Sequence, residues 1–220
     1  MQSTGDILTY NSLNGLKLLP ESNKRNVILT PETAAKLIDH LPHPADDIVE
    51  FAIYTGFRKS NILSLTIEQV HFYPEKGTAD VELELKGGRY ENYPIVPHAV
   101  EIIKRNISSR HEGYVFFNLR TGTHMKDIHK SFDKAVRILN LTVNGTKLRF
   151  HDLRHIAVTW LHQQGIGDDI LQELLGHRNR ETTERYITRN RSALAQVLLS
   201  LPKIERKKPS EMQMVRNTAV

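Results

Sequence analysis

One stretch of strict alternation between apolar residues and glutamates constrains the fold of this chain more than any other feature. Residues 81–85 alternate in this way, two consecutive glycines follow at 87 and 88, and a second extended run covers 90–96. A period of two on both sides of a glycine pair predicts a β-hairpin. The basic residues Lys86 and Arg89 fall at its tip.

Helical patterns flank this hairpin on both sides. Thr30, followed by a proline and an acid, is typical of a helix start and predicts a helix to about Leu41. A second helix is expected from about Pro44 to Thr55, closed by a glycine, with Asp46 and Asp47 as capping residues near its start. Further helical patterns lie near residues 57–70, 98–107, 126–140, 150–164, 168–176, 180–189 and 192–200, and a short strand is expected at 114–117.

These patterns together predict an α+β fold that is mainly helical, with a small antiparallel hairpin or sheet beside a helical core. The 30 Lys and Arg residues outnumber the 25 Asp and Glu residues, which gives a net charge of +5 and makes a polyanionic partner plausible. The chain has no Cys, which excludes disulfides, thiolate metal sites and a cysteine nucleophile. No apolar leader or membrane-length apolar stretch is found, so we expect a soluble intracellular protein.

The segment from Arg149 to Gly165 carries the most chemical information. Its apolar residues fall on one helical stripe, which assigns His151, Arg154 and His155 to the opposite side. His151 and Arg154 stand one turn apart, so both can reach a single anion. Two other interpretations are a solvated, histidine-rich helix face and a zinc helix, because the two histidines have the i, i+4 ligand spacing. The permanent cation of Arg154 beside the metal position argues against zinc.

Two other segments hold candidate functional residues. His177 lies between two short predicted helices and is followed nine residues later by Tyr186. Four arginines surround this phenol in sequence and lower the cost of forming a phenolate; they are Arg178, Arg180, Arg185 and Arg189. Arg58 follows a glycine-terminated helix. The ordinary alternatives are a packed aromatic for Tyr186 and an ion-paired helix-start arginine for Arg58.

Taken together, five pieces of this chain resemble the tyrosine recombinases, the phage integrase family, in identity, order and spacing. The resemblance covers about residues 26–200. The pieces are Arg58 after Thr-Gly-Phe, Lys86 on the hairpin, the run His-Asp-Leu-Arg-His from His151, the Leu-Gly-His that ends at His177, and Tyr186.

This resemblance implies the catalytic domain of a site-specific recombinase or integrase that cuts and rejoins DNA through a 3′-phosphotyrosine, in the integration or excision of a phage or another mobile element. Tyr186 is then the nucleophile, and Arg58 and Arg154 hold the non-bridging phosphate oxygens. His151 and His177 assist proton transfer, and Lys86 protonates the leaving 5′-oxygen. No cofactor, metal ion or ATP is expected, because the phosphotyrosine keeps the bond energy and the arginines neutralise charge.

The resemblance also implies partners. Double-stranded DNA with specific recombination sites is the expected substrate, and further DNA-binding candidates are Arg89, Arg149, Arg178 and Arg180. A homotetramer is expected on paired sites and a monomer without DNA, in the cytoplasm of a bacterial or phage-infected cell and in association with the nucleoid. The apolar segment from Ala193 to Leu201 is expected either to dock on a neighbouring subunit or to pack within its own.

Two features depart from the family pattern. Asn61 stands where an acid is common, and we regard it as a tolerated variant because Asn still donates and accepts hydrogen bonds. Residues 1–25 resemble a linker or the remnant of an absent N-terminal core-binding domain, whereas 26–200 is the expected catalytic domain and 201–220 a basic tail. The alternatives are a DNA-binding remnant without full recombination activity and a type IB topoisomerase-like enzyme.

Overall fold

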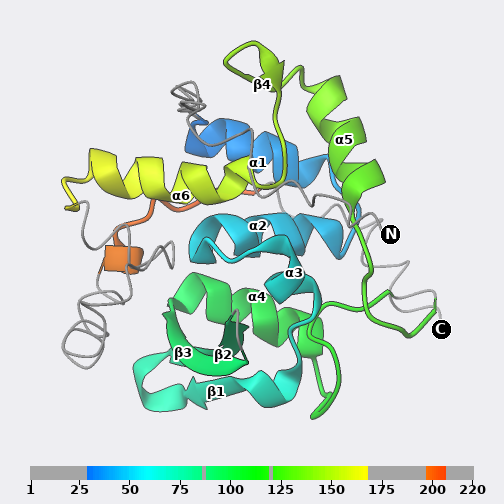
Figure 1. The fold of residues 1–220 in the computed structure, drawn as a ribbon, viewed down its shortest axis with the longest axis vertical. Helices are drawn as coiled ribbons and strands as arrows, with labels where there is room; N and C mark the ends of the chain where they lie inside the picture. Colours follow the sequence, from blue (N-terminus) through cyan, green and yellow to red (C-terminus); the bar gives the residue numbers. More distant parts are fainter. Residues whose placement is uncertain (1–28, 86–87, 119–120, 168–196, 207–220) are drawn as a thin grey trace, which may run out of the picture.

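The computed structural model describes residues 29–85, 88–118, 121–167 and 197–206. Its centre is helix α2 (Ala45–Thr55), with α1 (Pro31–Asp39) and α6 (Asp152–Gln163) on one side and α4 (Pro97–Ile107) on the other (Figure 1). A small sheet packs on the side of α4 that faces away from α2, so α4 lies between the central helix and the sheet (Figure 1). The expected α+β, mainly helical fold class is confirmed.

Local sequence signals explain where α1 begins and where α2 ends. The Thr30 hydroxyl accepts a hydrogen bond from the Thr33 backbone N–H at 3.3 Å, as expected of an N-cap residue. Helix α2 ends at Gly56, which has a φ of 64°. Glycine adopts this left-handed conformation without the steric cost that a side chain brings, so the chain can leave the helix sharply there.

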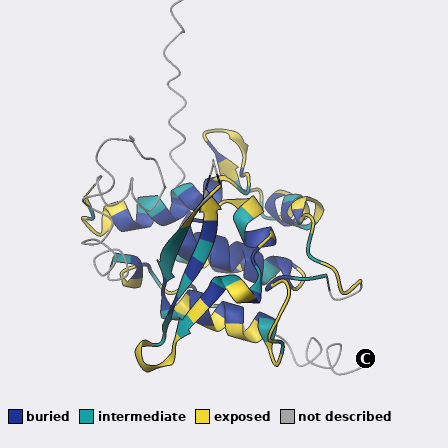
Figure 2. Ribbon diagram, turned by 60° about the horizontal axis from the view of Figure 1, so that its bottom comes forward, coloured by how far each residue is buried: buried dark blue, intermediate teal, exposed yellow. Residues whose placement is uncertain are grey.

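The sheet has three antiparallel strands in the order β1 (Val70–Tyr73), β2 (Thr78–Leu85) and β3 (Arg89–Ile95). The predicted hairpin is β2 and β3, and buried residues alternate with more exposed ones along β2 (Figure 2). Strand β1 was not predicted, because four residues are too few to establish a period of two, although the more buried Val70 and Phe72 do alternate with exposed residues.

The remaining described elements connect or flank these helices and strands. They are α3 (Lys59–Leu63), η1 (Ile67–Gln69), η2 (Pro74–Lys76), α5 (His129–Ile138), β4 (Thr142–Val143) and β5 (Thr146–Lys147). The expected strand at 114–117 is wrong: Tyr114 and Phe117 form only isolated bridges. The segment instead crosses the core, with Val115 and Phe116 fully buried, so packing rather than a ladder fixes it. The helices expected at 168–176 and 180–189 lie outside the described residues.

The described C-terminal segment, 197–206, returns to the central helix. Leu198, Leu201 and Ile204 are buried. The Ile204 backbone N–H donates to the Tyr54 hydroxyl at 2.8 Å, and burial raises the pKa of Tyr54 to about 12. This segment therefore packs within its own chain. Among the described helices, none has the length and apolar character needed to cross a membrane.

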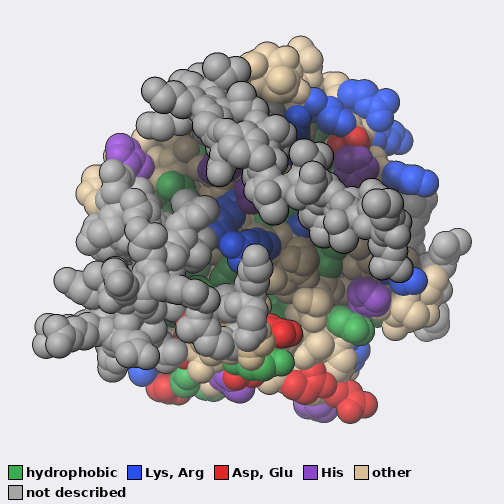
Figure 3. Space-filling view, in the orientation of Figure 1, with side chains coloured by type: hydrophobic (Ala, Val, Ile, Leu, Met, Phe, Trp, Pro, Cys, Tyr) green, Lys and Arg blue, Asp and Glu red, His purple; other side chains and the backbone are tan. Residues whose placement is uncertain are grey.

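Charge is distributed unevenly over the molecule. On the face drawn in Figure 3, Lys and Arg side chains gather over α5, whereas Asp and Glu side chains lie toward the three-stranded sheet at the opposite edge. A polyanion would therefore approach the α5 side of this face more readily than the sheet side.

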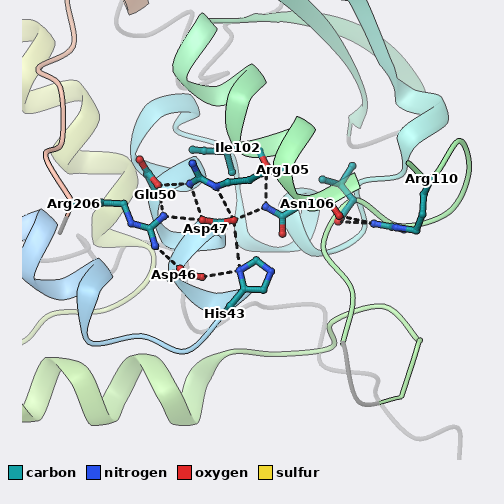
Figure 4. A network of polar contacts seen from close by, with 10 residues as sticks. His43, Asp46, Asp47, Glu50, Ile102, Arg105, Asn106, Arg110 and Arg206 are labelled. Atoms are coloured by element: carbon teal, nitrogen blue, oxygen red, sulfur yellow. Dashed lines mark hydrogen bonds and ion pairs between the residues drawn. The ribbon is translucent and has the colours of Figure 1, made fainter. Parts of the chain in front are cut away.

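An ionic network at the start of α2 joins three parts of the fold (Figure 4). Asp47, with only 1% of its surface exposed, accepts hydrogen bonds from Arg105 of α4 at 2.7 and 2.9 Å and from Arg206 at 2.8 Å. Glu50 accepts from the same two arginines at 2.6 and 2.8 Å, and Asp46 binds Arg206. Asp46 and Asp47 lie in the first turn of α2 as expected, but Pro44 holds the N-cap position without a side-chain bond, and arginines from distant segments bind both carboxylates.

The same network predicts a pH dependence of stability. His43 Nδ1 lies 3.3 Å from an Asp46 oxygen, and this hydrogen bond raises the pKa of His43 above its ordinary value. A raised pKa in the folded state stabilises the fold below about pH 6.5, and the stabilisation is lost as the pH rises through the folded pKa. We expect His43→Gln to lower the free energy of unfolding more at about pH 6 than at about pH 9. The difference should not exceed about 1 kcal/mol, because 37% of the histidine side chain is exposed.

Urea denaturation of both proteins at the two pH values measures this difference. An equal loss of stability at both values would contradict the assignment of the proton to His43.

Candidate active site

The Arg154 side chain reaches from α6 to the end of α2. Its Nη1 donates to the Gly56 carbonyl oxygen at 2.6 Å, and only 8% of the residue is exposed. The sequence pattern placed Arg154 on the helix face opposite the apolar stripe, where a solvent-exposed side chain is expected. That prediction is wrong because α6 packs across the C-terminal end of α2, which covers this arginine and supplies a carbonyl to it. The predicted apolar stripe of α6 is buried as expected.

Arg58 lies beside Arg154. It is exposed, and its extended backbone directly precedes α3. Burial and then the positive charge of Arg58 lower the pKa of Arg154 to about 10. Two cations held close together in a partly desolvated place repel each other, and an anion bound between them would remove that repulsion. The pair is therefore suited to an anion, and the planar donor forks of arginine match a phosphate.

Asn61 does not change the charge of this pair. It lies on α3, three residues after Arg58, and its Oδ1 is 3.5 Å from the Ser60 hydroxyl, which donates to it. No residue of α3 is acidic, so the helix that follows Arg58 offers no carboxylate to offset the arginine.

His151 and Arg154 share the first turn of α6, since the Arg154 backbone N–H donates to the His151 carbonyl at 3.3 Å. His151 is exposed, and its ring meets that of His155 edge-on with centroids 5.4 Å apart. Asp152 is buried and accepts from the backbone N–H of Arg149 at 2.7 Å, so it fixes the turn into the helix. The exposed histidine thus stands at the helix start that also carries the buried arginine.

The structure brings together Arg58, His151 and Arg154 among the predicted catalytic residues. Lys86, His177 and Tyr186 lie outside the described residues, as do Arg178 and Arg180. Strand β2 ends one residue before Lys86. Of the other DNA-binding candidates, Arg149 is exposed just before α6, and the Arg89 backbone begins β3.

Sequence reasoning missed Tyr93. This β3 residue is paired with the buried Val81, and its ring lies edge-on to Phe57 with centroids 5.9 Å apart. Its hydroxyl donates to Glu91 at 3.2 Å, and its electrostatic effect opposes that of Arg58 by raising the pKa of Arg154. The available signal was the alternation of the hairpin, which puts position 93 on the same face as the buried Ile95.

Sequence reasoning also missed a group of exposed cations on α5 and just before it, here called the α5 basic surface. Its members are Lys126, Lys130, Lys134 and Arg137. The nearby acids bind other lysines: Asp127 is 3.0 Å from Lys59, and Asp133 is 2.6 Å from Lys147. Charged residues on one face of a helix usually do no more than face the solvent. The sequence pattern alone therefore gave no reason to propose a binding surface here.

One group in the described part of the chain has the spacing of metal ligands. Donor atoms of His43, Asp46 and Asp47 lie within 4.8 Å of one another. The two carboxylates already bind Arg105 and Arg206, whose charges occupy the place of a cation. We assign this group to the stability of the fold.

Comparison with known proteins decides the family. Residues 27–192 match the phage integrase family. The chain belongs to the phage integrase family.

Several integrase-family relatives resemble it over most of its length. The integrase of Salmonella phage P22 is 29% identical over 179 residues, which is 78% of this chain and 46% of that protein. Tyrosine recombinase XerA of Pyrococcus furiosus is 33% identical over 175 residues, 77% of this chain and 58% of that protein. The chain therefore spans about half the length of these relatives.

Solved integrase structures share its fold. The integrase of mycobacterium phage Brujita gives a TM-score of 0.57 at 19% identity and covers 86% of this chain and 63% of its own. A lambda integrase dimer bound to a COC′ core site gives a TM-score of 0.56 at 21% identity, covering 72% of this chain and 60% of that chain.

The arginine pair predicts an unusual stability change. Arg58→Ala removes a like charge beside Arg154, so we expect the free energy of unfolding to stay constant or to rise by up to about 1 kcal/mol in anion-free buffer. The variant should also lose most of the stabilisation that added inorganic phosphate gives the wild type. Chemical denaturation with and without phosphate measures both effects. Lys76→Ala, at an exposed cation beside the sheet, is the matched control, and a loss of stability specific to Arg58→Ala would contradict the account.

Proposed function

We propose that this chain contains the catalytic domain of a site-specific DNA recombinase or integrase, which cuts and rejoins DNA through a 3′-phosphotyrosine intermediate. The observation that carries the proposal is the Arg58 and Arg154 pair, two neighbouring cations suited to one phosphate. Family membership and the names of the relatives support it. The catalytic domain is proposed to cover residues 26–200, with 1–25 as a linker or remnant and 201–220 as a basic tail.

The proposed reaction is a transesterification at one phosphodiester. The Tyr186 oxygen attacks phosphorus and loses its proton, the bond to the 5′-oxygen breaks, and Lys86 protonates that oxygen. Attack by a 5′-hydroxyl on the phosphotyrosine reverses these steps and rejoins the strand. His151 and His177 bind the phosphate and move the phenol proton. The arginines stabilise charge on the non-bridging oxygens, a contribution for which loss of one donor typically costs about 10²- to 10³-fold in rate.

The proposed partner is double-stranded DNA with specific recombination sites, bound by a homotetramer on paired sites. Docking of residues 197–206 on the central helix of the same chain supports a monomer in the absence of DNA. Among proteins of this fold, the XerH recombinase has been solved bound to its difH substrate in a pre-cleavage complex. We further propose that the protein acts on nucleoid DNA in the cytoplasm.

A covalent trapping experiment tests this function. A library of nicked duplexes of varied sequence, whose cleaved flank diffuses away, is incubated with the protein and resolved on a denaturing gel. The wild type should form an adduct at the 3′ side of the break, and Tyr186→Phe should form none. Tyr73→Phe, on the outer strand β1, controls for loss of a phenol. Binding without any adduct would favour the DNA-binding remnant, and relaxation of supercoiled DNA without site preference would favour a topoisomerase.

The α5 basic surface predicts the salt dependence of DNA binding. Each phosphate contact by a cation contributes about −0.9 to the slope of log affinity against log salt concentration. Replacing Lys130, Lys134 and Arg137 with Gln should therefore flatten the slope by about 2 to 3. The matched control replaces Lys36, Lys76 and Lys104, three exposed lysines on other elements. Equal flattening in both triple variants, measured by fluorescence anisotropy, would show that net charge rather than this surface determines binding.

A further inference from the structure

Strand β3, which follows the hairpin turn, contacts the loop between α2 and α3 through Tyr93 and Phe57. This loop carries Arg58 and the Gly56 carbonyl that accepts from Arg154. We propose that Tyr93 is a positioning residue, which holds Arg58 and Arg154 in the geometry that binds the scissile phosphate. The inference rests on the proposed function and adds a residue to that site.

The Tyr93 ring acts through Phe57. Phe57 stands between Gly56, whose carbonyl accepts from Arg154, and Arg58 itself. It is 8% exposed, with Tyr93 edge-on to it at 5.9 Å and Phe51 of α2 also edge-on at 5.9 Å. The turn between α2 and α3 is therefore held on one side by the helix and on the other by the strand. Loss of the strand contact would free Phe57 to move, and with it the backbone that orients both arginines.

The Tyr93 hydroxyl is also held in place, by a hydrogen bond within its own strand. It donates a hydrogen bond to Glu91 Oε2 at 3.2 Å. Tyr93 raises the pKa of Arg154, in opposition to the neighbouring Arg58.

The strand is rigid enough to transmit this constraint. Across β2, Tyr93 is paired with Val81, which is completely buried, and Ile95 two residues on is 1% exposed. Strand β3 is therefore fixed to the core directly across from the contact and two residues after it. Because the same hairpin carries Lys86 in sequence, the experiment must separate an effect on the arginines from an effect on the lysine.

Three DNA substrates make this separation by single-turnover cleavage. The first has an ordinary scissile phosphate. The second carries a methyl group in place of one non-bridging oxygen, which removes the charge that the arginines neutralise. The third has sulfur in place of the leaving 5′-oxygen, and this thiolate leaves without needing a proton from a general acid.

We expect Tyr93→Ala to slow cleavage of the ordinary substrate by about tenfold or more, since small misplacements of catalytic groups are costly. On the methylphosphonate the defect should shrink to about twofold or less, and on the 5′-thio substrate it should persist. Tyr93→Phe keeps the ring and should show a smaller defect with the same pattern. Tyr73→Ala, at a tyrosine of β1, is the matched control and should cleave normally.

Two other patterns would overturn the proposal. Relief by the 5′-thio substrate would mean that Tyr93 acts through Lys86. An equal defect on all three substrates would mean that the residue serves only the stability of the fold.

A binding measurement tests Tyr93 even if no DNA is cleaved. Inorganic phosphate is titrated into the protein while the Arg154 Nε–Hε resonance is followed by NMR. Tyr93→Ala should weaken phosphate binding by about fivefold or more, because the pair is less well preorganised, and Tyr73→Ala should not. Unchanged affinity in both Tyr93 variants would overturn the proposal. The wild type could fail to cleave DNA while its phosphate binding still depends on Tyr93. That result would reject the proposed function and leave the positioning role of Tyr93 standing.

Discussion

The hydrogen bond from Arg154 to the Gly56 carbonyl is the contact on which the site depends. It joins the first turn of α6 to the end of α2, although 98 residues separate the two groups in sequence. A buried arginine needs such an acceptor, because the cost of removing its charge from water is otherwise uncompensated. The left-handed conformation of Gly56 ends α2 and leads within two residues to Arg58, so one turn fixes both members of the arginine pair.

Helix α2 carries opposite electrostatic arrangements at its two ends. At its start, three carboxylates bind Arg105 and Arg206, and the charges of these residues are offset within the fold. At its end, burial and the positive charge of Arg58 lower the pKa of Arg154. The first arrangement stabilises the folded chain, whereas the second is costly until an anion binds. Groups that are costly in the free protein are typical of functional sites.

Local sequence signals predicted much of this fold. The N-cap of Thr30, the left-handed glycine after α2 and the period-two hairpin each depend on a few neighbouring residues, and each was predicted correctly. The acidic network was missed because its arginines come from α4 and from residue 206, far from α2 in sequence. Periodicity likewise identified the apolar stripe of α6 but not the burial of Arg154, which depends on what packs beside that stripe. The role of Tyr93 also arises from a contact between separate segments.

The binding of one phosphate by both arginines is the central claim, and a structure of the Tyr186→Phe protein bound to a duplex tests it most directly. The account predicts that guanidinium nitrogens of Arg58 and Arg154 lie within about 3 Å of the non-bridging oxygens of the same phosphate. The Gly56 carbonyl should still accept from Arg154 in that complex. A duplex whose nearest phosphates contact neither arginine, or contact the two arginines at different nucleotides, would contradict it.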